Sequence, residues 1–192
     1  MKQKYYALMD DENKLILTSW DEAKEYIAKM NKPKYKSFQS IEEAQAFLDG
    51  TELEILKPAV FIDGSYDPAT GCYSFGGVFM YDNQIISFNK KYLPDEYSSM
   101  RNVAGEIKGA GYAINYAVNR GIKELHIYYD YIGIEKWYTK QWKASSKIAL
   151  EYVNFLEKVR DKINIYFHKI KSHTNNYYND MADKLAKEAL GI

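Results

Sequence analysis

Apolar and polar residues follow two different periods along this chain, and each period predicts one kind of element. Short alternating runs at residues 5–9, 15–18 and 35–38 predict three strands. The polar residues 11–13, which separate the first two runs, predict a hairpin turn. The chain is therefore expected to begin with a β-hairpin and to reach a third strand after an intervening segment.

An imperfect internal repeat predicts two short helices in the same region. The segment SWDEAKEYI, which begins at Ser19, echoes the segment SIEEAQAFL, which begins at Ser40. Each copy opens with a capping box, Ser19 with Glu22 and Ser40 with Glu43. The order is ββαβα, and so few residues predict a thin core for this module, which we assign to residues 1–48.

A larger pattern follows a linker at residues 49–58, where Gly50 and Pro58 interrupt regular structure. The expected strands are residues 60–62, 75–81, 85–88, 125–129 and 163–170. Helical spacing predicts one helix from Asn102 to a C-cap at Gly121, further helices after the fourth strand, and a last helix around residues 181–189. An antiparallel hairpin followed by βαβα units predicts an α/β fold for residues 59–192, a mixed five-stranded sheet with helices on both faces.

Four acidic residues fall at junctions of this larger pattern. Asp63 and Asp130 each follow an apolar run, Glu106 lies one turn into a helix, and Asp183 lies in the last helix. Sites in such sheets gather at the carboxyl ends of strands. Two carboxylates about 4 Å apart repel by roughly 4 kcal/mol at an effective dielectric constant near 20. If the fold brings the four together, a hard divalent cation such as Mg²⁺ is expected to relieve that repulsion.

Composition narrows the classes of function. The formal net charge is zero, so any binding of nucleic acid must come from local patches. Cys72 is the single cysteine, which permits no internal disulfide and suits a reducing compartment. The start of the chain lacks the apolar stretch of a signal peptide, and no later run could span a bilayer. We therefore expect a soluble, cytoplasmic protein without a membrane partner.

The first module resembles the hybrid-binding domain found at the N-terminus of many type 1 ribonucleases H, which is related to a viral viroplasmin module. The matching residues are Tyr5-Tyr6-Ala7, Thr18-Ser19-Trp20 and Lys34-Tyr35-Lys36-Ser37-Phe38. In that family an aromatic pair packs on the DNA strand of an RNA/DNA hybrid, which implies this role for Trp20 and Tyr35. Lys36 and Tyr6 are expected beside them. The alternative is that Trp20, Tyr35 and Phe38 simply form the small core.

The larger pattern resembles the catalytic domain of type 1 ribonuclease H. The matching motifs are Phe61-Ile-Asp63-Gly-Ser65, Asn102-Val-Ala-Gly-Glu106, Tyr128-Tyr-Asp130, and Ile170-Lys-Ser-His173 leading to Asn179-Asp-Met-Ala-Asp183. The resemblance implies that the four acidic residues hold two Mg²⁺ ions, with Mn²⁺ as a possible substitute, and hydrolyse the RNA strand by in-line displacement. It implies that His173 assists proton or product release. Asp180 competes with Asp183 as a ligand, and the motif favours Asp183.

The resemblance also implies further contacts with an RNA/DNA hybrid. Asn102 matches a residue that contacts RNA in the minor groove, and main-chain groups of Gly64 and Ser65 are expected to add hydrogen bonds. The Lys- and Trp-rich stretch at residues 136–147 looks like a shortened form of a basic handle that grips the DNA strand. Its candidate residues are Trp137, Trp142 and Lys143. The alternative for this stretch is a helix packed through its tryptophans.

Three departures from the family pattern qualify these expectations. Tyr131 follows Asp130 where relatives usually have a small residue such as serine, and we expect its ring to crowd the site. Ser172 replaces the common glycine before His173, which we expect to stiffen that loop. The acidic residues 10–12 lie on a hairpin that is frequently basic in relatives, so weaker hybrid binding is expected.

Two other functions remain open from the sequence. One is a non-catalytic hybrid-binding protein, and the complete set of four carboxylates argues against it. The other is a DNA-directed nuclease of the same superfamily, such as a junction resolvase, and the first module together with Asn102 argues against that. No obligate protein partner is implied, and we expect a monomer.

Overall fold

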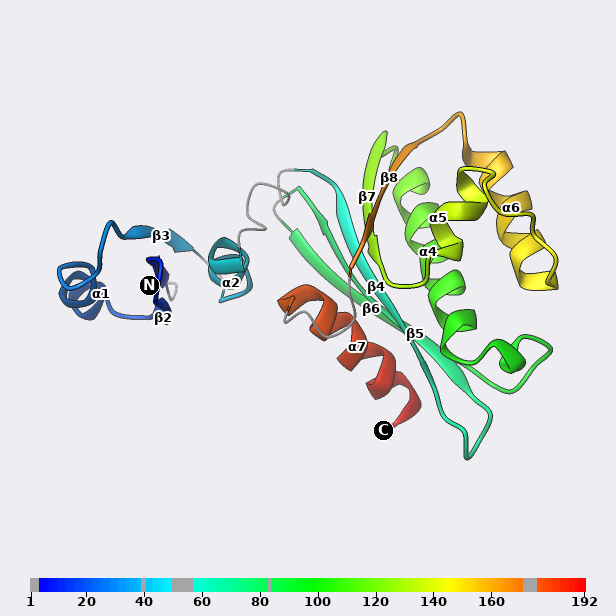
Figure 1. Cartoon of the computed structure of the whole chain (residues 1–192), viewed down its shortest axis with the longest axis horizontal. Helices are drawn as coiled ribbons and strands as arrows, with labels where there is room; N and C mark the ends of the chain where they lie inside the picture. Colours follow the sequence, from blue (N-terminus) through cyan, green and yellow to red (C-terminus); the bar gives the residue numbers. More distant parts are fainter. Residues whose placement is uncertain (1–3, 39–40, 50–56, 83, 171–175) are drawn as a thin grey trace. The chain divides into compact units, whose positions relative to one another are not determined.

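A computed structural model describes residues 4–38, 41–49, 57–82, 84–170 and 176–192 (Figure 1). The chain separates into two compact units, Met1–Glu54 and Ile55–Ile192, and each is described by itself. In the described part of the chain, no helix combines the length and the apolar character needed to cross a membrane.

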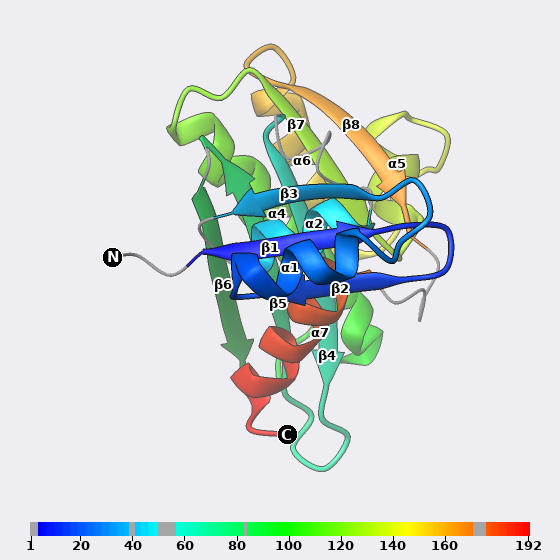
Figure 2. The ribbon, with the colours of Figure 1, turned by 90° about the vertical axis from the view of Figure 1, so that its left-hand side faces the viewer.

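The first unit contains a three-stranded antiparallel sheet and two helices. Its elements are β1 (Tyr5–Met9), β2 (Lys14–Leu17), α1 (Trp20–Ile27), β3 (Lys34–Phe38) and α2 (Ile41–Asp49). β1 lies between β2 and β3 (Figure 2). The Ser19 hydroxyl accepts a hydrogen bond from the Glu22 N–H at 3.4 Å, which confirms the predicted N-cap of α1. The expected ββαβα order is confirmed, whereas Ser40 lies outside the described residues.

The core of the first unit is small, as predicted. It is formed by the buried side chains of Ala7, Phe38, Ala44 and Leu48, which lie on β1, β3 and α2. The Phe38 ring packs on that of Phe47 at 5.6 Å. A core of this size gives limited stabilisation to the unit.

The second unit is built on a mixed five-stranded sheet, as predicted. Its elements are β4 (Ala59–Tyr66), β5 (Tyr73–Tyr81), β6 (Gln84–Tyr92), the 3₁₀-helix η1 (Ser98–Met100), α4 (Asn102–Asn119), β7 (Glu124–Tyr129), α5 (Gly133–Tyr138), α6 (Lys147–Val159), β8 (Asn164–Lys169) and α7 (Tyr177–Leu190). The strand order is β6-β5-β4-β7-β8. β4 pairs antiparallel with β5 and parallel with β7. α7 covers one face of the sheet, and α4, α5 and α6 lie on the other (Figure 1).

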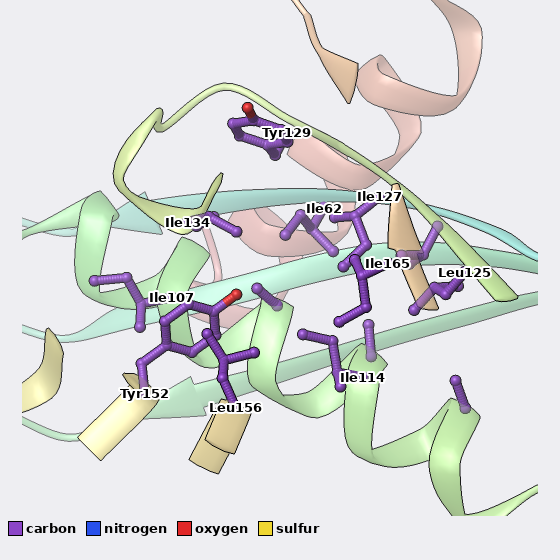
Figure 3. Close-up of a cluster of buried hydrophobic side chains, with 14 of the residues drawn as sticks. Ile62, Ile107, Ile114, Leu125, Ile127, Tyr129, Ile134, Tyr152, Leu156 and Ile165 are labelled. Atoms are coloured by element: carbon purple, nitrogen blue, oxygen red, sulfur yellow. The ribbon is translucent and has the colours of Figure 1, made fainter. Parts of the chain in front are cut away.

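Alternation along the strands divides the core of the second unit between the two faces of the sheet. Ile62, Ile127 and Ile165 point from β4, β7 and β8 toward apolar residues of α4 and α6 (Figure 3). Phe61 belongs to the opposite face, where its ring stacks on Tyr128 at 4.3 Å and packs on Tyr178 of α7 at 5.5 Å. Both faces of the central strand β4 are therefore buried, which fixes its register.

One element boundary differs from prediction in a way that affects the site. The strand predicted to end at Ile62 continues to Tyr66, because β5 supplies an antiparallel partner for residues 59–66. The parallel pairing with β7 ends at Phe61. The prediction that Asp63 ends a strand is therefore wrong. Asp63 lies within β4, two residues beyond the last residue that pairs with β7. Asp130 follows β7 directly, as predicted.

Candidate active site

Asp63 lies in β4 beyond the last residue that pairs with β7. Its Oδ1 atom accepts a hydrogen bond from the main-chain N–H of Gly64 at 2.7 Å. A Cβ atom at position 64 would lie 2.2 Å from the Asn102 carbonyl oxygen and 2.8 Å from the Glu106 nitrogen. Glycine thus lets α4 touch β4, and this close approach brings Glu106 to the sheet beside Asp63.

Glu106 is the most buried of the four predicted carboxylates, with only 3% of its surface exposed. Its Oε2 atom accepts a hydrogen bond from the Tyr131 main-chain N–H at 2.9 Å. Its Oε1 atom accepts one from the Asn102 side-chain amide at 3.4 Å. A buried carboxylate needs such donors, so both neighbours stabilise Glu106 where α4 meets the sheet. Asn102 itself is exposed at the start of α4.

Asp183 is carried to the sheet by a second close approach through glycine. A Cβ atom at Gly76 of β5 would lie 2.2 Å from the Ala182 carbonyl oxygen and 2.4 Å from the Ala186 nitrogen of α7. The Asp183 carboxylate is half-buried, and its Oδ2 atom accepts a hydrogen bond from the Lys187 ammonium at 2.7 Å. Asp180, the competing candidate, is exposed in the first turn of α7.

The four carboxylates act on one another electrostatically. The pKa of Asp63 is raised to about 6, chiefly by burial and also by the charges of Asp183 and Asp130, while the Gly64 hydrogen bond and the charge of Lys187 oppose the rise. Burial likewise raises the pKa of Glu106 to about 8, with the charges of Asp63 and Asp130 adding to the rise. The fold therefore brings β4, α4, α7 and the end of β7 together around one acidic cluster. Sequence reasoning predicted these four elements.

The donor chemistry of this cluster fits a hard divalent cation. Carboxylate oxygens are the ligands that Mg²⁺ prefers, and a bound cation would favour the ionised form of groups whose pKa burial and repulsion have raised. Within the described ranges, no three His, Cys, Asp or Glu side chains are grouped closely enough to hold one ion.

A second candidate site lies on the first unit. Tyr6, Trp20 and Tyr35 form an aromatic cluster, with ring centroids 5.3 Å apart for the first pair and 6.2 Å apart for the second. They line a surface pocket of about 360 Å³ together with Leu8, Lys36 and Ser37. Trp20 is 42% exposed and Tyr35 is 52% exposed, whereas Phe38 is buried. Of the three aromatics considered for the core, only Phe38 belongs to it.

The Lys- and Trp-rich stretch of the second unit divides between core and surface. Trp137 lies on α5 and is buried in the main core, where its ring packs against Tyr152. Trp142 and Lys143 are exposed. The alternative of a helix packed through its tryptophans therefore holds for Trp137 alone. Trp142 and Lys143 lie on the surface. Contact of any of the three with substrate stays a prediction.

Other predicted residues have mixed outcomes. His173 and Ser172 lie outside the described residues. Ser65 is buried, and its contact with substrate, like that of Gly64, stays a prediction. Sequence reasoning missed Lys187, although the i, i+4 spacing after Asp183 is a recognised signal for an ion pair on a helix.

The fold and the acidic cluster define a class of α/β protein with carboxylates around the end of a central pair of parallel strands. Residues 57–191 match the family model described as RNase H, and residues 4–48 match the model described as Ribonuclease H1 N-terminal domain. The chain therefore belongs to the RNase H family, with the N-terminal domain that the first unit resembles.

Curated relatives agree with this assignment. A protein named Ribonuclease H from Chlorobium phaeobacteroides is 32% identical over 60 residues, which cover 30% of this chain and 41% of the relative. Another from Chlorobium luteolum is 22% identical over 146 residues, which cover 70% of this chain and 95% of the relative. The chain thus spans about two fifths of the length of the first relatives it matches.

Solved structures show the same fold for the second unit. RNase H1 from Halobacterium salinarum superposes with a TM-score of 0.57 at 19% identity, covering 70% of this chain and 98% of that one. LC11-RNase H1, solved in complex with an RNA/DNA hybrid, superposes with a TM-score of 0.55 at 14% identity, covering 70% of this chain and 99% of that one. The predicted ribonuclease H-like fold is confirmed.

Proposed function

We propose that this protein is a metal-dependent endoribonuclease that hydrolyses the RNA strand of RNA/DNA hybrids. The observation that carries the proposal is the convergence of four carboxylates, from four separate elements, whose charges raise the pKa values of Asp63 and Glu106. Membership of the RNase H family supports the reaction class, and one protein of the same fold was solved with a hybrid bound.

Asp63, Glu106, Asp130 and Asp183 would hold two Mg²⁺ ions in this proposal, with Mn²⁺ as the alternative ion. When bound, such ions activate a water molecule and stabilise the departing 3′ oxygen at an RNA phosphate. The chain's own groups prepare the ligands: the Gly64 N–H orients Asp63, and burial keeps bulk water from Glu106. His173 would move a proton or release product, as the family resemblance implies.

The first unit would hold the hybrid through its aromatic pocket. Stacking of bases or sugars on exposed aromatic rings tolerates any sequence, and nearby lysines attract the phosphate backbone. Trp20 and Tyr35 offer the exposed ring surface, and Lys36 lines the same pocket. On the second unit, Asn102 is exposed beside Glu106 and would contact the RNA 2′-hydroxyl.

Cleavage of a labelled RNA/DNA hybrid in Mg²⁺ tests the proposal, with duplex DNA and duplex RNA as controls. We expect cuts only in the RNA strand of the hybrid, and no cuts after chelation of the metal. Asp183→Asn should abolish cleavage and leave hybrid binding intact, whereas the exposed Asp180→Asn on the same helix should cleave normally. Cutting of duplex DNA would instead identify a DNA-directed nuclease. Binding of hybrid without any cutting would identify a non-catalytic binder.

A further inference from the structure

Tyr131 connects two of the proposed metal ligands through its main chain. It follows Asp130 directly, and its N–H donates the 2.9 Å hydrogen bond to Oε2 of Glu106. The conformation of the corner between β7 and α5 therefore decides where that donor points. Whatever holds this corner also holds Glu106 relative to Asp130.

The side chain of Tyr131 folds back onto the start of α5. A Cβ atom at Gly133 would lie 2.4 Å from Cε1, 2.7 Å from Cζ and 2.9 Å from the hydroxyl oxygen of the Tyr131 ring. The Trp137 ring packs beside it, with centroids 5.7 Å apart. Trp137 is itself buried against Tyr152, so this neighbour is fixed in place. The ring expected to crowd the acidic cluster thus packs on α5, and it also stays near the cluster, since burial and the charge of Glu106 raise the pKa of the Tyr131 hydroxyl.

We propose that Tyr131 is a positioning residue whose ring, seated on Gly133 and held by Trp137, fixes the corner that carries the hydrogen bond to Glu106. The proposal rests on the proposed function. It makes Tyr131 and Gly133 a matched pair, because a Cβ atom at 133 would displace the tyrosine ring from this position. A small residue at 131 removes that clash.

A double-mutant cycle of Gly133→Ala and Tyr131→Ser tests the pair. In metal-free protein, Gly133→Ala should speed hydrogen exchange of the amide at position 131 by about tenfold, since the displaced ring loosens the corner. The same variant should bind Mg²⁺ more weakly in calorimetry and cleave hybrid with a lower kcat at unchanged KM. In the Tyr131→Ser background, alanine at 133 should have none of these effects, since the three atoms nearest to the added Cβ belong to the ring that serine lacks, and alanine favours helix over glycine.

Gly111→Ala supplies a matched control, because a Cβ atom at Gly111 of α4 meets nothing within 4 Å. It should leave exchange at amide 131, Mg²⁺ affinity and kcat unchanged. Equal effects of Gly133→Ala in both backgrounds would overturn the proposal, as would unchanged exchange at amide 131. If Gly133→Ala fails to fold, a folded double variant supports the matched pair and an unfolded one overturns it. If the wild-type protein does not cleave hybrid, the proposed function is wrong. Hydrogen exchange at amide 131 and Mg²⁺ binding would still test whether the Tyr131–Gly133 pair holds Glu106.

Discussion

The two units of this chain use aromatic and charged residues in opposite ways. The first unit leaves Trp20 and Tyr35 exposed around a pocket and buries only a handful of apolar side chains. The second unit buries Tyr73, Tyr129 and even the carboxylate of Glu106. Exposed aromatic rings can be carried by a thin scaffold, whereas interacting carboxylates such as Asp63 and Glu106 need a larger core to hold them against desolvation and mutual repulsion.

This difference predicts that function and stability are separable in the first unit and opposed in the second. An exposed ring contributes little to folding, so its loss should weaken binding alone. A buried carboxylate destabilises the metal-free fold, so its neutralisation should stabilise the protein while ending catalysis.

Asp63→Asn is expected to have the largest effect, and it tests whether function and stability are opposed in the second unit. If the proposed function holds, hybrid cleavage should fall by at least about 10²-fold, since the reaction loses a charged metal ligand. The metal-free protein should melt several degrees higher at pH 7.5, because the pKa of Asp63 is raised to about 6 and its charge opposes folding. Cleavage assays and calorimetry measure the two effects. A fall in both activity and melting temperature would contradict the proposed trade-off.

The pH dependence of metal-free stability gives the next largest effect. Glu106 holds its proton to a pKa of about 8 in the folded state, against 4.5 as its ordinary value, so unfolding between these pH values releases a proton. Stability should therefore fall as pH rises from about 5 to 8, by on the order of 2 kcal/mol, and be regained below this window. Urea titrations across the range measure the slope. Saturating Mg²⁺ should flatten it, and Glu106→Gln should remove most of it.

Trp20→Ala should weaken hybrid binding by about tenfold, since stacking on one aromatic ring is worth roughly 1–3 kcal/mol. The melting temperature should change little, because Trp20 is exposed. Tyr26→Ala is the matched control: Tyr26 lies on the same helix and is 46% exposed, but does not line the pocket. Fluorescence anisotropy with labelled hybrid compares the two. Collapse of the first unit in Trp20→Ala alone would return Trp20 to the core and erase the contrast between the units.

The smallest effect is expected from Lys187→Gln. The ion pair between Lys187 and Asp183 is partly exposed, so its loss should cost about 0.5 kcal/mol at low salt and less at high salt. Chemical denaturation of the metal-free protein at two salt concentrations measures this. Lys184→Gln, which removes an exposed i, i+4 pair on the same helix, serves as the control. A loss well above that of the control would show that the charge of Lys187, which also lowers the pKa of Asp63, stabilises the fold beyond its ion pair with Asp183.

Local patterns predicted most of the fold, and tertiary contacts account for what they missed. Capping at Ser19, the turn at Gly121 and the period of α4 are properties of neighbouring residues, so sequence reasoning could find them. The extension of β4 to Tyr66 depends on pairing with β5, which no local pattern encodes.

The candidate site divides in the same way. Motif order selected four acidic residues that interact electrostatically in the fold, and their role as metal ligands stays a prediction. The fate of the side chains around them was not predictable, since it depends on distant neighbours. Trp137 is buried and Trp142 is exposed although both belong to one Lys- and Trp-rich stretch. The Tyr131 ring lies over Gly133, where a larger residue would meet it.

The glycines at positions 64 and 76 have a consequence for how the site could change. Each lets the backbone of a helix approach the backbone of a strand, because an added Cβ atom would lie 2.2 Å from a helix carbonyl oxygen. Even substitution by alanine, the smallest possible change, would add a methyl group that pushes the helix and the strand apart. Under the proposed function, an ion of another radius would therefore be accommodated by the carboxylate side chains rather than by these two backbone contacts.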